Sequence, residues 1–65
     1  MKRARLLQHL RQHGCRFERE GRRHSIWINP QEDLSTAVPR HREIPFRTAA
    51  KICRDLAIPE PTGDR

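Results

Sequence analysis

The sequence lacks any long apolar run. No stretch of its 65 residues is apolar enough to span a bilayer. The N-terminal segment MKRARLLQHLRQHG also lacks the apolar core of a secretory signal peptide. We therefore expect no membrane association, no export and a cytoplasmic location.

Cysteine is scarce as well. Cys15 and Cys53 are far apart in the sequence and belong to no CxxC pair. Their spacing to the four histidines matches no zinc-site pattern, so the sequence predicts no metal site and no cofactor. In a reducing cytosol we expect both cysteines to be small residues of the core.

The chain is too short to enclose a deep substrate cavity. A domain of about 60 residues buries only roughly 60% of the surface that its unfolded chain exposes. Chemistry is therefore expected on a surface or at an edge. We expect one domain over residues 1–58 and a flexible tail over residues 59–65, because Pro59 and Pro61 end the last helical pattern.

Lysine is rare among the basic residues, which are almost all arginine. Only Lys2 and Lys51 are lysines among the fourteen basic residues, and the net charge is +6. Residues 1–54 hold thirteen basic and five acidic residues, so this part carries +8. Arginine offers a planar fork that matches phosphate and stacks on bases. Nucleic acid is the leading partner, and a solvated surface that keeps a small protein soluble is the alternative.

The periodicity of apolar residues predicts an α+β fold in the order α-β-β-β-α. An amphipathic helix over residues 2–13 ends at Gly14. Strands are predicted over residues 15–20, 25–28 and 35–38. A final helix carries Ala49, Ile52, Cys53 and Leu56, with Thr48 as its N-cap. We expect a two-layer domain in which both helices cover one face of a three-stranded antiparallel sheet.

The second predicted strand raises a question of orientation. Ile26 and Ile28 share a face and are the expected core pair, which places Trp27 on the open face. There Trp27 would stack on an RNA base or be covered by a protein partner; ordinary packing is the alternative. Strand alternation puts His24 on the side of Ile26 and Ile28, toward the helices, unless the turn before it breaks the alternation.

Three segments in order resemble the HicA family of toxins. They are His13-Gly14-Cys15, the run REGRRHSIWINP over residues 19–30, and VPRHREI over residues 38–44. The resemblance covers nearly the whole chain, from Met1 to about Ile58. It implies a fold like that of double-stranded-RNA-binding domains. It also implies a ribonuclease that cleaves mRNA and arrests translation, and a HicB-like antitoxin that silences it in a toxin–antitoxin hetero-oligomer.

The same resemblance assigns catalysis to His24, the histidine that follows Gly21 and two further residues. Those two residues are often small or polar in the family, whereas here they are Arg22 and Arg23. This departure either strengthens phosphate binding or crowds the site. Without the resemblance, a histidine at the end of a strand is often only a hydrogen-bonded edge residue.

RNA cleavage needs only a base that takes the proton from a 2′-hydroxyl, and an imidazole titrates near neutral pH. Arg22 and Arg23 would hold the scissile phosphate. His41 lies between two arginines and is the candidate for the acid or a further phosphate contact. The candidates for RNA binding are Lys2, Arg3, Arg5, Trp27, Arg40 and Arg42, with solvated surface as the alternative.

Two other classes of function fit the same composition. One is a non-catalytic RNA-binding module of the same fold, in which His24 is incidental. The other is a protein-interaction domain whose basic face meets an acidic partner. Replacing His24 by alanine separates the enzyme from the RNA-binding module, and a direct RNA-binding assay separates that module from the interaction domain.

Overall fold

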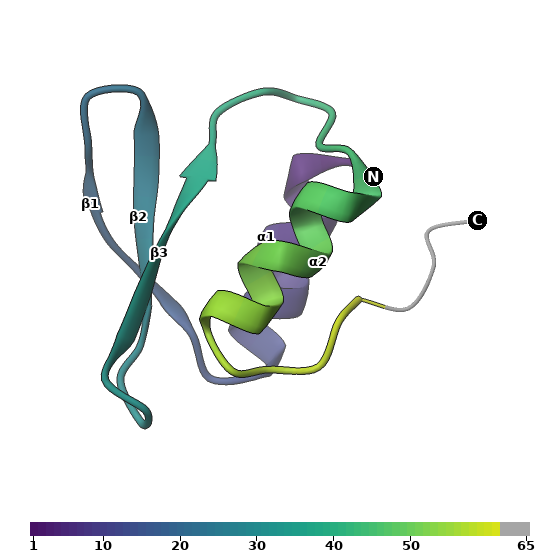
Figure 1. The fold of residues 1–65 in the computed structure, drawn as a ribbon. Coiled ribbons are helices and arrows are strands. Elements are labelled where there is room, and N and C mark those ends of the chain that lie inside the picture. Colours follow the sequence, from purple (N-terminus) through teal and green to yellow (C-terminus); the bar gives the residue numbers. More distant parts are fainter. Residues whose placement is uncertain (62–65) are drawn as a thin grey trace.

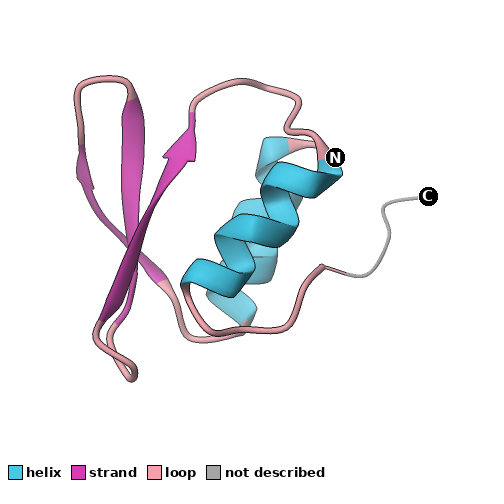
Figure 2. Ribbon diagram, in the orientation of Figure 1, coloured by secondary structure: helices cyan, strands magenta, loops and turns pink. Residues whose placement is uncertain are grey.

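The computed structural model describes residues 1–61, which fold in the predicted order α-β-β-β-α (Figure 1). Helix α1 spans Arg3–Gln12, strands β1, β2 and β3 span Arg16–Glu20, His24–Asn29 and Leu34–Pro39, and helix α2 spans Phe46–Asp55. Figure 2 shows that a short turn joins β1 to β2, another joins β2 to β3, and a longer loop leads from β3 to α2. Of the tail predicted over residues 59–65, residues 62–65 lie outside the described residues, and its flexibility stays a prediction.

Both helices end in the same backbone motif. At the end of α1, Gly14 has a φ of +84°, and the amides of Gly14 and Cys15 donate to the carbonyls of Arg11 and Leu10. This is the Schellman arrangement, and it confirms Gly14 as the residue that follows the helix. At the end of α2 the left-handed position is taken by Ala57, with a φ of +57°.

The start of α2 differs from the sequence prediction. The helix begins at Phe46, and Pro45 occupies the N-cap position without a side-chain hydrogen bond. The Pro45 carbonyl already accepts a helical hydrogen bond, from the amide of Ala49. Thr48 therefore lies inside the first turn, and its prediction as the N-cap is wrong.

The sheet has the order β1-β2-β3, and β2 runs antiparallel to both neighbours. A bulge interrupts the pairing of β1 with β2 between Phe17 and Arg19. Both helices lie on one side of the sheet, as predicted (Figure 1). The helices do not bury β1, whose five side chains are all exposed. This α+β architecture is consistent with a double-stranded-RNA-binding-domain-like fold.

Trp27 faces the helices and is only 2% exposed, so the prediction that it lies on the open face is wrong. Along β2 the buried residues alternate as Ser25, Trp27 and Asn29. Ile26 and Ile28 are half-buried on the uncovered face and do not form the core pair. Burying the Trp27 indole alone removes about 150–250 Å² of surface from water, which favours the face of β2 that carries it.

The two polar residues beside Trp27 tolerate burial because they are hydrogen-bonded. The Asn29 amide donates to the carbonyl of Leu56 over 2.7 Å, and its oxygen accepts from the amide of Gln31 over 3.2 Å. Asn29 thereby joins the central strand to the end of α2. Ser25 donates to a carboxylate oxygen of Glu20.

The core lies between the sheet and the helices, and it includes Leu6, Leu10, Trp27, Val38, Ile44, Ile52 and Leu56. Cys15 and Cys53 are both buried and free, which confirms them as core residues. Burial raises the pKa of the Cys53 thiol to about 11 and also raises the pKa of Cys15. Within residues 1–61, neither helix has the length and apolarity needed to cross a membrane.

Candidate active site

The turn between β1 and β2 carries the residues on which the predicted chemistry depends. Gly21 and His24 face each other across it, joined by a 2.7 Å hydrogen bond from the Gly21 amide to the His24 carbonyl. A Cβ atom at position 21 would lie 3.0 Å from that carbonyl oxygen, so this close approach favours glycine. Arg22 and Arg23 form the tip and are both exposed.

His24 is the first residue of β2, and its side chain is exposed. Because it alternates with Ser25 and Trp27, it points to the uncovered face of the sheet, together with Ile26 and Ile28. The expectation that it shares a side with the two isoleucines is confirmed, but that side is the open one. Within residues 1–61, no hydrogen bond or ion pair engages its ring, so the imidazole is accessible to a ligand.

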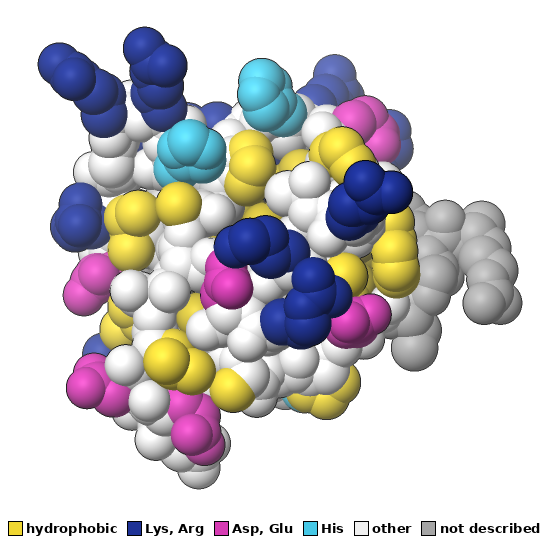
Figure 3. All heavy atoms as spheres, viewed as in Figure 1, with side chains coloured by type: hydrophobic (Ala, Val, Ile, Leu, Met, Phe, Trp, Pro, Cys, Tyr) yellow, Lys and Arg dark blue, Asp and Glu magenta, His cyan; other side chains and the backbone are white. Residues whose placement is uncertain are grey.

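The loop after β3 lies at the same end of the sheet as the turn (Figure 1). His24 pairs with Pro39, so His41 follows two residues beyond the partner of His24. His41 and Arg42 are exposed. Figure 3 shows histidine side chains at this end of the molecule, with basic side chains on either side of them. The structure thus brings His24, Arg22, Arg23, His41 and Arg42 to one end of the sheet.

Arg40 belongs to the same loop but turns toward the protein. Its Nε donates to Glu20 over 2.8 Å, and its terminal nitrogens donate to the carbonyls of Gly21, Arg22 and His24. The guanidinium group therefore has four protein acceptors. Arg40 was predicted as an RNA contact, but these bonds occupy its donors within the fold.

Three of the other predicted RNA contacts lie on or beside α1. Arg3 is half-buried and donates to the Pro39 carbonyl over 2.8 Å and to the Ser25 hydroxyl over 3.0 Å. Lys2 is exposed and pairs with Glu43 over 3.0 Å. Arg5 is exposed on the same helix.

Trp27 has no open face on which a base could stack. Its ring is buried, with the Arg11 guanidinium carbon 5.2 Å from the ring centroid and Phe17 edge-on at 6.2 Å. The proposed stacking of Trp27 on RNA is therefore incompatible with this structure. Its Nε1 is the one buried side-chain nitrogen or oxygen within residues 1–61 that lacks a hydrogen-bond partner.

Two residues that the sequence did not single out connect the turn to α1. The Glu20 carboxylate accepts from both Ser25 and Arg40, and Ser25 in turn accepts from Arg3. The Ser25 hydrogen bond, followed by the bond and charge of Arg40, lowers the pKa of Glu20. The only signal in the sequence was that Glu20 is the single acidic residue beside an arginine-rich turn.

Metal ligands do not cluster in the part of the chain that the structure describes. No group of three or more histidine, cysteine or acidic side chains could hold an ion there. His9 and His13 stack with ring centroids 4.5 Å apart on α1, and His9 Nε2 lies 2.8 Å from the Pro59 carbonyl. These two histidines do not belong to the end of the sheet that carries His24.

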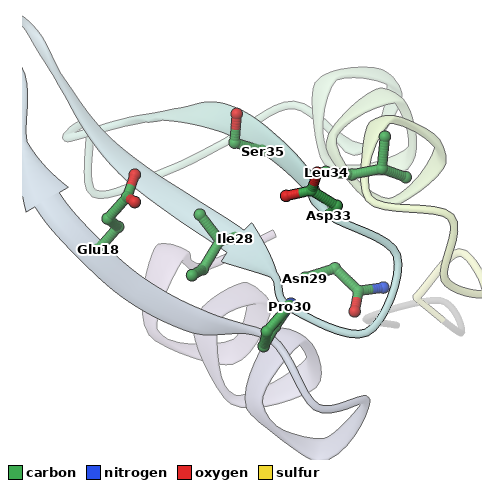
Figure 4. A pocket seen from close by; sticks show the side chains of 7 residues that line it. All are labelled: Glu18, Ile28, Asn29, Pro30, Asp33, Leu34 and Ser35. Atoms are coloured by element: carbon green, nitrogen blue, oxygen red, sulfur yellow. The ribbon is translucent and has the colours of Figure 1, made fainter.

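Two hollows lie away from His24. A hollow of about 180 Å³ at the β2–β3 turn is lined by Glu18, Asp33 and their neighbours (Figure 4). Its two carboxylates disfavour phosphate. A groove of about 280 Å³ lies between α1 and the sheet, where exposed Phe17 is close to Leu7 and Arg11. Neither hollow is lined by His24.

Comparison with known proteins supports the sequence resemblance. A family model described as the HicA toxin of bacterial toxin–antitoxin systems matches residues 3–58. No curated protein and no solved structure gives a significant match. The family match covers most of the 65-residue chain. The chain therefore belongs to the HicA family of toxins of bacterial toxin–antitoxin systems.

Proposed function

We propose that this toxin is a metal-independent endoribonuclease that cleaves mRNA in the cytoplasm with His24 as general base. The observation that carries the proposal is the placement of His24. Its exposed imidazole lies on the uncovered sheet face, at the end where exposed arginines and His41 also lie. Membership of the HicA family supports the toxin role.

The reaction uses the nucleophile that RNA itself contains. His24 takes the proton from a 2′-hydroxyl, and the resulting oxygen attacks the adjacent phosphorus and expels the 5′-oxygen. The products are a 2′,3′-cyclic phosphate and a 5′-hydroxyl end. DNA lacks the 2′-hydroxyl and is not cleaved. Positioned proton transfer of this kind contributes about 10²–10⁴-fold to the rate.

The neighbouring cations have separate roles. Arg22 and Arg23 are exposed, form no ion pair within residues 1–61, and would bind the phosphate that is attacked. Arg42 would bind a flanking phosphate. His41 is the candidate that protonates the leaving 5′-oxygen, because it lies two residues beyond Pro39, the strand partner of His24. Lys2, Arg3 and Arg40 have acceptors within the protein, so we assign them no phosphate.

The test compares His24→Ala with His13→Ala, which removes an exposed histidine from the end of α1 instead. Purified parent and both variants are incubated with single-stranded RNA in EDTA, and the new 5′ and 3′ ends are identified. We expect the parent and His13→Ala to cleave and His24→Ala to lose at least about 10²-fold in rate. Equal cleavage by His24→Ala would exclude the mechanism. RNA binding without cleavage by the parent would favour the non-catalytic module.

The partner of this toxin is proposed to be a HicB-like antitoxin. The family implies a toxin–antitoxin pair. Covering the uncovered sheet face would block access of RNA to His24. Coexpression with the product of the neighbouring gene, followed by copurification and the same cleavage assay, tests this partner directly.

A further inference from the structure

One arginine of the loop after β3 contacts the backbone of the turn. Arg40 donates to the carbonyls of Gly21, Arg22 and His24, and also to the Glu20 carboxylate. All four acceptors lie within the five residues that end β1 and carry the turn. A guanidinium group has five donors in a fixed fork, which suits several acceptors at once.

This turn needs external support. Two-residue hairpin turns favour central residues with positive φ, because that twist matches the strands. Arg22 and Arg23 both lack positive φ, and neither is glycine. Their neighbouring positive charges also repel each other. The turn therefore obtains little stability from its own sequence, and its carbonyls are held instead by Arg40.

The support continues into the helical layer. Glu20 accepts from Arg40 and from the Ser25 hydroxyl, and that hydroxyl accepts from Arg3. Arg3 is half-buried and also donates to the carbonyl of Pro39, the strand partner of His24. The chain of contacts thus reaches His24 on both sides, through the turn before it and through β3 beside it.

We propose that Arg40 is a positioning residue, whose guanidinium fixes the turn so that His24 is held in one orientation toward RNA. The inference rests on the proposed role of His24 as general base. It reassigns a residue that the sequence predicted as a phosphate contact. Arg42 lies two positions away, is exposed and has no ion pair within residues 1–61, so it keeps the phosphate-binding role.

The two roles differ in kinetics. Loss of a positioning contact misplaces the base in the transition state and therefore lowers kcat. A phosphate contact that is equally strong in the enzyme–substrate complex and in the transition state affects binding alone, so its loss raises KM. Arg40→Ala is expected to lower kcat by about 10²-fold with KM little changed, because small misplacements of a catalytic group have effects of that order. Arg42→Ala removes the same charge and is expected to raise KM with kcat retained.

Arg40→Lys separates geometry from charge. Lysine keeps the positive charge but has a single nitrogen, which cannot reach four acceptors spread over the turn. We expect its kcat to stay close to that of Arg40→Ala. A parental kcat in Arg40→Lys would show that the positive charge alone is sufficient and would overturn the inference. So would a rise in KM with unchanged kcat in Arg40→Ala.

NMR spectra test the orientation of His24 without measuring cleavage, so they decide the question even if a variant loses activity because it is less stable. The His24 ring signals in NMR spectra are expected to shift or broaden in Arg40→Ala and Arg40→Lys, and to keep their parental position in Arg42→Ala. Circular dichroism confirms which variants are folded at the assay temperature. Parental His24 signals in a folded Arg40→Ala would refute the inference. If His24→Ala cleaves RNA as fast as the parent, it is the proposed function that fails, and the NMR comparison still decides whether Arg40 orders the turn.

Discussion

Replacement of Trp27 by alanine should destabilise the fold far more than replacement of its neighbour Ile26. Trp27 is 2% exposed and contacts the core, whereas Ile26 is half-buried on the uncovered face. Truncating a buried tryptophan costs about 3–5 kcal/mol. Truncating Ile26 removes three carbons at about 0.8 kcal/mol for each one that is buried, which gives about 1 kcal/mol for a half-buried side chain.

The difference is large for a chain of this size. In a chain of fewer than about 70 residues, a single hydrophobic core rarely supplies more than about 3–5 kcal/mol of net stability. Trp27→Ala is therefore expected to lose its cooperative unfolding transition. Ile26→Ala is expected to keep the transition at a lower urea midpoint. The assay is urea unfolding followed by far-ultraviolet circular dichroism, because Trp27 is the only tryptophan. Ile28→Ala is the control from the same face as Ile26. A larger loss of stability in Ile26→Ala than in Trp27→Ala would refute the assignment of the two faces.

Three further predictions concern stability. Ala57→Gly should raise the free energy of unfolding by up to about 1 kcal/mol, because Ala57 has a φ of +57° where glycine is unstrained; an unchanged or lower urea midpoint would contradict this. Asn29→Ala should cost about 1–3 kcal/mol, because it leaves the buried Leu56 carbonyl without its donor, and equal urea midpoints would count against that hydrogen bond. The third concerns pH. The pKa of Glu20 is lower in the fold than its ordinary value, so its contribution is present above about pH 5 and is lost as the pH falls through the folded pKa. The stability difference between the parent and Glu20→Gln should therefore shrink between pH 7 and pH 3, and a constant difference would contradict the linkage.

Much of the fold could be predicted because its signals are local. Leu6 and Leu10 lie on one stripe of α1, and both are fully buried. Gly14 ends α1 because only a residue that tolerates positive φ fits there. The face of β2 could not be predicted in the same way. Alternation separates two sets of side chains, but it does not say which set meets the helices. The choice depended also on hydrogen bonds that join Ser25 to Arg3 and Asn29 to Leu56, partners that are distant in the sequence.

The same limit applies to the arginines around His24. In the sequence, Arg23, Arg40 and Arg42 are alike: each is charged and lies in a turn or loop beside a histidine. Their roles diverge because the antiparallel pairing of β2 with β3 brings position 40, and not position 42, against the carbonyls of the turn. A guanidinium that already has protein acceptors loses those hydrogen bonds if it turns to a phosphate, whereas an exposed one gains new bonds. Net charge therefore overstates the number of cations that could bind RNA, and in our proposal the site is His24 on a turn that Arg40 holds in place.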